Sequence, residues 1–192
     1  MRKMYLLFLT LLLSFVGYGQ IKSYTFTQSN GTYQELSTNK TILAEATANS
    51  GAGSFDTESW NVNLPFNFVY GTTTVNSCNV NSNGYLVFGA ISSSGTTPIS
   101  SATVYDGAIS AWARDINGAY DPSFESSVSW GVIGTAPNRV FVVQYKNVRP
   151  TYSVSATAIH LMNYQIRLAE TTNTVQIVYG PNSAFLGTTT SA

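Results

Sequence analysis

Apolar and polar side chains alternate along much of this chain, and that alternation leaves few folds open to it. In residues 62–70 every second side chain is apolar, and Asn63, Pro65 and Asn67 lie between the apolar ones. A period of two places one row of side chains on each face of an extended strand, whereas a helix needs apolar residues three or four positions apart. Because Pro65 cannot donate to a sheet ladder, this strand is expected to have a free edge.

Two further segments extend the pattern. Residues 78–88 alternate around Asn83-Gly84, a pair that accepts positive φ and predicts a tight turn. Segment 139–148 is apolar on both faces, which predicts a central strand. The polar row of Asn79, Asn81 and Asn83 is expected to face solvent or to line a ligand groove.

Residues 160–179 are expected to form a hairpin. Pairing Leu168 with Val175 or with Ile177 keeps the apolar faces matched, so both registers stay open. The segment 41–49 is a short helix candidate. Together the patterns predict an all-β fold, an antiparallel two-sheet β-sandwich of jelly-roll-like type.

The first 19 residues have the pattern of a secretory signal peptide. Arg2 and Lys3 precede the uncharged apolar stretch 5–16, and small residues stand at Gly17 and Gly19. The apolar stretch is shorter than the roughly 20 residues that a membrane-spanning helix needs. We expect export, cleavage after Gly19, no integral membrane anchor in this segment, and a final location outside the cell or on its outer surface.

Charge is sparse in this chain. Charged residues make up 9% of it, against about 25% in a typical soluble domain. Without Arg2 and Lys3, 7 basic groups face 9 acidic ones, so no basic nucleic-acid footprint exists. Cys78 is the only cysteine, which excludes an intramolecular disulfide, and its place on an apolar row predicts a buried thiol.

Six segments occur in an order that resembles a known module: Leu64–Phe68, Asn81–Gly89, Ile109–Asp115, Gly134–Tyr145, Asn163–Thr171 and Val175–Gly180. The module is the β-sandwich near the N-terminus of large secreted and cell-surface proteins of Bacteroidota-type bacteria. It is more distantly similar to the nidogen-like domain. Such proteins often carry fibronectin type III repeats and a type IX secretion sorting domain.

The resemblance also implies how the chain is organised. Residues 20–192 would form a single sandwich domain, and the family pattern continues with a further strand after a polar loop. We therefore expect the sequence to be a fragment of a longer multidomain protein whose last sandwich strand follows Ala192.

Catalytic residues are scarce in the sequence. His160 is the only histidine, and no Gly-x-Ser-x-Gly elbow accompanies it. Its apolar strand face favours a half-buried structural role. A glycosidase would need two carboxylates held about 5–10 Å apart, yet Asp106, Asp115, Asp121, Glu125 and Glu170 are scattered along the chain. The sequence thus predicts no enzyme and no catalytic residues.

One loop has oxygen-bearing side chains at a spacing that suits calcium. Asp115, Asn117 and Asp121 stand at positions one, three and seven around Gly118. The alternative is a plain turn, in which Asn117-Gly118 supplies the bend. Apart from this Ca²⁺ candidate, no cofactor is expected.

Aromatic side chains offer a second kind of site, because their rings can stack on the apolar faces of sugars. The candidates are Trp60, Trp112, Tyr120, Trp130 and Tyr152. Alternation places Trp60 and Trp130 inward, where such rings fill a core.

Two functions remain open. The first is a non-catalytic extracellular module for adhesion, matrix contact or display within a larger secreted protein. The alternative is a carbohydrate-binding accessory domain of a secreted hydrolase. The expected partners are the export machinery and an extracellular glycan or protein matrix.

Overall fold

A computed structural model describes residues 24–47, 54–89, 107–112, 114–118, 124–151 and 160–184. The chain divides into two units, residues 1–30 and 31–192. Residues 24–30, the described part of the first unit, contain no helix or strand. No helix in the described ranges is long and apolar enough to cross a bilayer.

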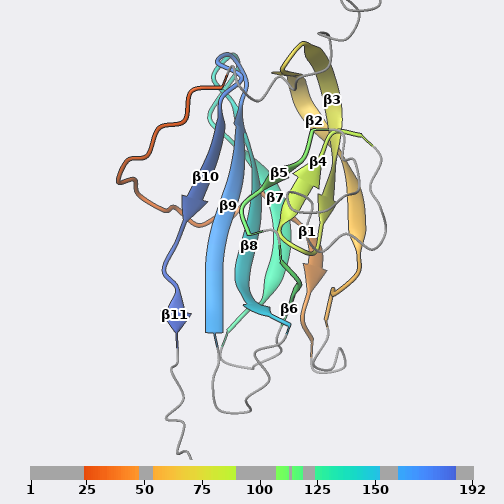
Figure 1. Ribbon diagram of the computed structural model, residues 1–192, viewed down its shortest axis with the longest axis vertical. Helices are drawn as coiled ribbons and strands as arrows, with labels where there is room; N and C mark the ends of the chain where they lie inside the picture. The colour runs from red at the N-terminus through yellow and green to blue at the C-terminus, as the bar shows by residue number, and fades with distance from the viewer. Residues whose placement is uncertain are drawn as a thin grey trace, which may run out of the picture. The chain divides into compact units, whose positions relative to one another are not determined.

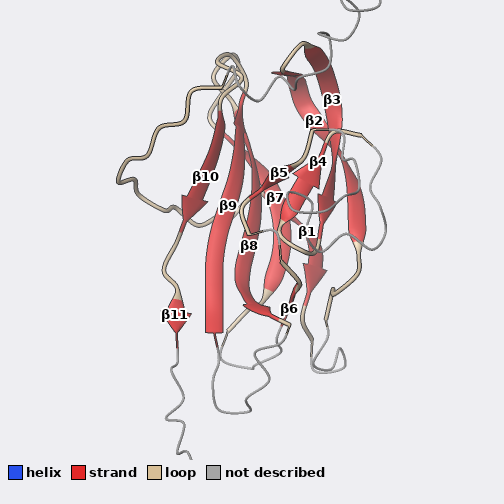
Figure 2. Ribbon diagram, viewed as in Figure 1, coloured by secondary structure: helices blue, strands red, loops and turns tan. Residues whose placement is uncertain are grey.

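Every regular element that the structure describes is a β-strand (Figures 1 and 2). The strands are β1 (Lys40–Glu45), β2 (Ser59–Tyr70), β3 (Thr73–Asn81), β4 (Tyr85–Val87), β5 (Ile109–Ser110), β6 (Ile116–Gly118), β7 (Ser127–Ile133), β8 (Val140–Pro150), β9 (His160–Ala169), β10 (Val175–Tyr179) and β11 (Ser183–Ala184). They form two antiparallel sheets. The larger has the order β1-β7-β8-β9-β10, with β6 on β8 and β11 on β9, and the smaller has the order β2-β3-β4-β5. The predicted β-sandwich is confirmed.

The core lies between the sheets. Alternate residues of β2, from Val62 to Phe68, are buried. They join one apolar cluster with Phe141 and Val143 of β8 and Ile166 of β9. Full burial of one such side chain contributes about 1.5–3 kcal/mol. The alternation that predicted the strands is therefore also what joins the two sheets.

Several local predictions are confirmed. β2 is an edge strand, and its register with β3 shifts between Asn63 and Phe68, where Pro65 lies. β8 lies between β7 and β9, as expected of a central strand. In the hairpin, Leu168 pairs with Val175, which settles the register that the sequence left open.

The helix candidate at 41–49 is wrong, and so is the solvent-facing alternative for the asparagine row. Residues 40–45 form β1 against β7, not a helix, because pairing with a neighbouring strand outweighs a weak local preference. Asn81 and Asn83 are buried, not part of a solvated row. The Asn83 amide N–H donates to Asn81 Oδ1 at 2.8 Å, and Asn83 Oδ1 accepts from the Ile116 amide at 3.0 Å.

The β3–β4 turn requires a glycine at Gly84. Its φ is +83°, and a Cβ added there would overlap the hydroxyl of Tyr164. The buried asparagines before it supply hydrogen bonds that a sheet ladder cannot make at a turn. This turn thereby connects the small sheet to β6 of the large one.

Candidate functional site

An extended segment, Gly31–Thr38, crosses the face of the large sheet that lies opposite the core (Figure 1). We call it the strap. Its backbone is bound by side chains of the sheet. The Leu36 amide donates to Gln144 Oε1 at 2.8 Å, and Gln165 Nε2 donates to the Gln34 carbonyl at 2.9 Å. Side chains thus replace the ladder hydrogen bonds that the strap lacks.

Two glycines allow the strap to lie close to the sheet. A Cβ at Gly131 of β7 would lie 3.3 Å from a Leu36 methyl and 3.1 Å from the Asn39 carbonyl oxygen. A Cβ at Gly180 would lie 2.9 Å from the ring of Tyr33. Larger residues at either position would push the strap away from the sheet.

Beneath the strap lies a pair of fully buried glutamines. Gln144 of β8 and Gln165 of β9 face each other in the ladder, and Gln165 Nε2 donates to Gln144 Oε1 at 2.8 Å. Gln144 Nε2 is also buried and has no hydrogen-bond partner among the described residues. Such a group costs about 1–3 kcal/mol in lost hydration.

Arg167 continues the same row, two residues after Gln165. Its Nε and Nη2 donate to Gln165 Oε1 at 2.8 and 2.6 Å. Burial lowers the pKa of Arg167 from its ordinary value, because desolvation disfavours the charged form. Among the described residues, no carboxylate lies within ion-pair distance of this guanidinium.

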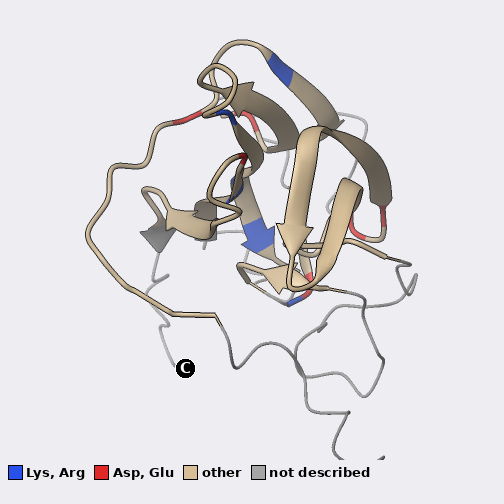
Figure 3. Ribbon diagram, turned by 90° about the horizontal axis from the view of Figure 1, so that it is seen from above, with Lys and Arg blue, Asp and Glu red and all other residues tan. Residues whose placement is uncertain are grey.

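Ion pairs join other side chains near the strap. Lys146 Nζ lies 2.7 Å from Glu35 Oε1 on the strap and 3.2 Å from Glu125 Oε2. Lys40 Nζ lies 2.7 Å from Glu125 Oε1. Burial alone would raise the pKa of Glu125, but hydrogen bonds from Lys40, Ser127 and Lys146 lower it to about 2. Elsewhere the charged positions lie scattered among neutral ones (Figure 3).

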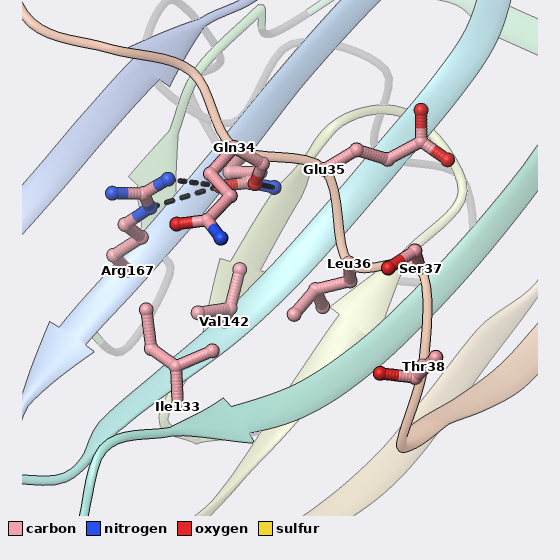
Figure 4. Close-up of a pocket in the computed structure, with 9 residues that line it drawn as sticks. Gln34, Glu35, Leu36, Ser37, Thr38, Ile133, Val142 and Arg167 are labelled. Carbon is pink, nitrogen blue, oxygen red and sulfur yellow. Dashed lines mark hydrogen bonds between the residues drawn. The ribbon is translucent and has the colours of Figure 1, made fainter.

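A pocket of about 130 Å³ opens between the strap and the sheet (Figure 4). The strap contributes one wall with Gln34, Glu35, Leu36, Ser37 and Thr38, and the sheet contributes Ile133, Val142, Gln165 and Arg167. This pocket was not predicted, because the strap has neither helix nor strand periodicity. The available sequence signal was the polar row of Gln144, Gln165 and Arg167 on two otherwise apolar strands.

The predicted calcium loop is only partly described. Asp115 is half-buried, while Asn117 of β6 is buried and its Oδ1 accepts from Arg149 Nε at 2.9 Å. Asp121 lies outside the described residues. Within those ranges, no three His, Cys, Asp or Glu side chains gather closely enough to hold a metal ion. The calcium site stays a prediction.

Asp115 does meet a second carboxylate that the sequence did not single out. Asp56 lies beside it, and Thr151 donates to Asp56 Oδ1 at 3.5 Å. Burial, followed by the charge of Asp115, raises the pKa of Asp56. The two residues are 59 positions apart in the printed sequence, so only the fold brings them together.

The three tryptophans have different surroundings. Trp60 and Trp130 pack against the core, as alternation predicted, and Trp130 lies 5.5 Å from Phe141 between ring centroids. Trp112 is 40% exposed. Tyr120 and Tyr152 lie outside the described residues, as do Asp106 and the whole predicted signal peptide.

The candidate histidine lies at an end of the large sheet. His160 begins β9, and its backbone pairs with Ala184 of β11.

Glu125 and Glu170, two of the carboxylates considered for glycoside hydrolysis, form ion pairs with cationic side chains. Glu170 Oε1 lies 2.5 Å from Arg139 Nη2.

Comparison with protein families yields a match over most of the chain. A profile of the protein family described as NIDO related matches residues 23–192. Neither the curated proteins nor the solved structures contain a significant match.

Proposed function

Because this chain belongs to the NIDO-related family, we propose that it is a non-catalytic extracellular module for adhesion, matrix contact or display. The observation that carries this proposal is the length of the family match, which includes every described strand. Family membership supports the nidogen-like resemblance and an extracellular placement. The predicted signal peptide at residues 1–19 points the same way.

Several finer points belong to the same proposal. We expect the module to be part of a longer secreted protein, and the resemblance to Bacteroidota-type cargo suggests type IX secretion. The scaffold suits display, because its core and strap hold the strands in place while most loops carry neutral polar residues. An extracellular protein or glycan matrix is the proposed partner.

The test is retention of the secreted mature chain on immobilised extracellular matrix and on biofilm material. We expect specific retention that a soluble excess of the same chain abolishes. The control is the same chain unfolded in urea and applied after dilution under conditions that prevent refolding. Equal recovery of folded chain from coated and uncoated surfaces would contradict an adhesive or matrix-binding role.

A carbohydrate-binding accessory domain is the second candidate function. The observation in its favour is a pair of exposed aromatics near one carbonyl: the Tyr179 hydroxyl donates to the Ala111 carbonyl at 2.8 Å, next to Trp112. Tyr179 is 56% exposed. We expect glycan-array binding that is lost in Trp112→Ala. The control is Phe26→Ala, which removes another exposed aromatic side chain and should retain binding. A blank array would remove this candidate.

A further inference from the structure

Arg167 differs from Lys40, Lys146 and Arg139 in what it binds, and like Arg149 it donates to a side-chain amide oxygen. Lys40, Lys146 and Arg139 each contact a carboxylate. Arg167 is half-buried, and its described hydrogen bonds go to one neutral amide oxygen, Gln165 Oε1. A partly desolvated charge without a counter-charge is costly, and here it lies on the wall of a pocket.

From this arrangement we propose that the strap pocket binds a carboxylate of a protein partner, an acidic side chain or a chain terminus, through Arg167. The inference rests on the proposed function and names the chemistry of the partner. Nε and Nη2 use one N–H each on Gln165, so the edge between Nη1 and Nη2 still carries free donors. That edge matches the two oxygens of a carboxylate.

The described residues around Arg167 do not neutralise it. The Glu35 carboxylate points away from it in Figure 4 and is bound to Lys146 at 2.7 Å. Tyr33 stays uncharged at neutral pH, because burial and the charge of Glu35 raise its pKa to about 12. The guanidinium is therefore available to an incoming anion.

The size and lining of the pocket favour an amino-acid carboxylate over a sugar acid. At about 130 Å³ it is smaller than the roughly 300–1,000 Å³ of sites for whole small molecules. Leu36, Ile133 and Val142 provide an aliphatic floor for a short stem. None of the described lining residues is aromatic, so a sugar ring would find no stacking surface.

The experiment is a titration of the mature chain with N-acetyl-L-aspartate, followed by amide and arginine Nε–H NMR signals. N-acetyl-L-asparagine, which has the same shape but lacks the side-chain carboxylate, and D-glucuronate are titrated in parallel. We expect the aspartate derivative to shift strap and Arg167 signals and to bind at least tenfold more tightly than either other probe.

Three variants locate the binding. Arg167→Gln should weaken aspartate binding at least tenfold, whereas Arg114→Gln, which removes an exposed arginine, should leave it unchanged. Ile133→Trp fills the pocket but keeps the Arg167–Gln165 hydrogen bonds. Loss of binding in this variant therefore cannot come from a loosened Gln165.

Three results would overturn the inference: equal binding of the aspartate and asparagine derivatives, unchanged binding in both pocket variants, or binding of glucuronate alone.

The matrix-retention test distinguishes a failure of this inference from a failure of the proposed function. Retention of wild type and Arg167→Gln to the same extent, without probe binding, defeats the inference and leaves the function standing. Probe binding without matrix retention defeats the adhesive function.

Discussion

Two stacked tyrosines of the core, Tyr145 and Tyr164, differ in whether the hydroxyl is hydrogen-bonded, and their hydroxyls therefore have opposite effects on stability. The rings of Tyr145 and Tyr164 lie 4.9 Å apart between centroids. The Tyr145 hydroxyl donates to the Asn81 carbonyl oxygen at 2.7 Å and lies 3.2 Å from the Tyr85 carbonyl oxygen. The Tyr164 hydroxyl is buried and finds no hydrogen-bond partner within the part of the chain that the structure describes. Burial raises the pKa of both phenols well above the ordinary value, so both stay neutral.

We therefore expect the two Tyr→Phe substitutions to differ in sign. Tyr145→Phe should lower the free energy of unfolding by about 1–2 kcal/mol, because buried carbonyls lose their donor. Tyr164→Phe should leave it unchanged or raise it by up to about 1 kcal/mol, because a buried unpaired hydroxyl is removed. Urea denaturation of the two variants measures the difference, and equal losses would contradict this account.

Glu125 should make stability depend on pH. Its pKa of about 2 in the folded chain lies below the ordinary 4.5, so ionisation favours the folded state. The contribution is full above about pH 4.5 and is lost as the pH falls towards 2. Because solvent screens part of the interaction, we expect Glu125→Gln to cost roughly 1–2 kcal/mol at pH 7.

The measurement is the free energy of unfolding at pH 7 and at pH 3 for wild type, Glu125→Gln and Glu45→Gln. Glu45 is an exposed glutamate of β1 and serves as the control. The gap between wild type and Glu125→Gln should narrow at pH 3. A gap that stays constant with pH would show that the Lys40 and Lys146 contacts contribute through packing and not through charge.

The strap is an element without regular structure that nonetheless buries a sheet face. Its anchors are long-range contacts from Leu36 and Gln34 to two strands more than 100 residues later. Gly131 and Gly180 provide the room for it. It therefore depends on a completed β7–β8–β9 sheet and should form after that sheet does.

Removing the apolar anchor of the strap should loosen it. Leu36 is 6% exposed, and Leu36→Ala should cost about 2 kcal/mol, at the lower end for a buried leucine because the strap can adjust. Ile42→Ala, at a 45% exposed position in β1, should cost well under half of that. Chemical denaturation gives both values. Hydrogen exchange at the backbone amide of residue 36 should be faster than in the wild type in Leu36→Ala and unchanged in Ile42→Ala.

The sandwich as a unit protects its single thiol. Cys78 is 1% exposed in the core cluster, and burial raises its pKa to about 12. Since the thiolate is the reactive form, the folded chain should react with a disulfide reagent at pH 8 far more slowly than the chain unfolded in urea. The reaction rate should follow the unfolding transition. Fast labelling without denaturant would contradict the packing of the two sheets.

The sequence by itself determined the strands, their buried faces and the turns, which are set by residues close together in the chain. Alternation at 62–70 indicated both the strand β2 and its buried face, and Asn83-Gly84 marked the turn. Paired apolar rows also indicated the β9–β10 hairpin, although matched faces left two registers equally acceptable. Such features are local, because the strand period and turn geometry are set within a few residues.

Only the tertiary structure decided which side chains meet across long stretches of chain. It buried Asn81 and Asn83, brought Asp56 beside Asp115, and laid the strap over Gln144 and Gln165. Whether a polar residue faces water or a buried partner depends on what another segment places over it. The period of a strand carries no information about that segment, so the pocket beside Arg167 appears only once the large sheet and the strap are assembled.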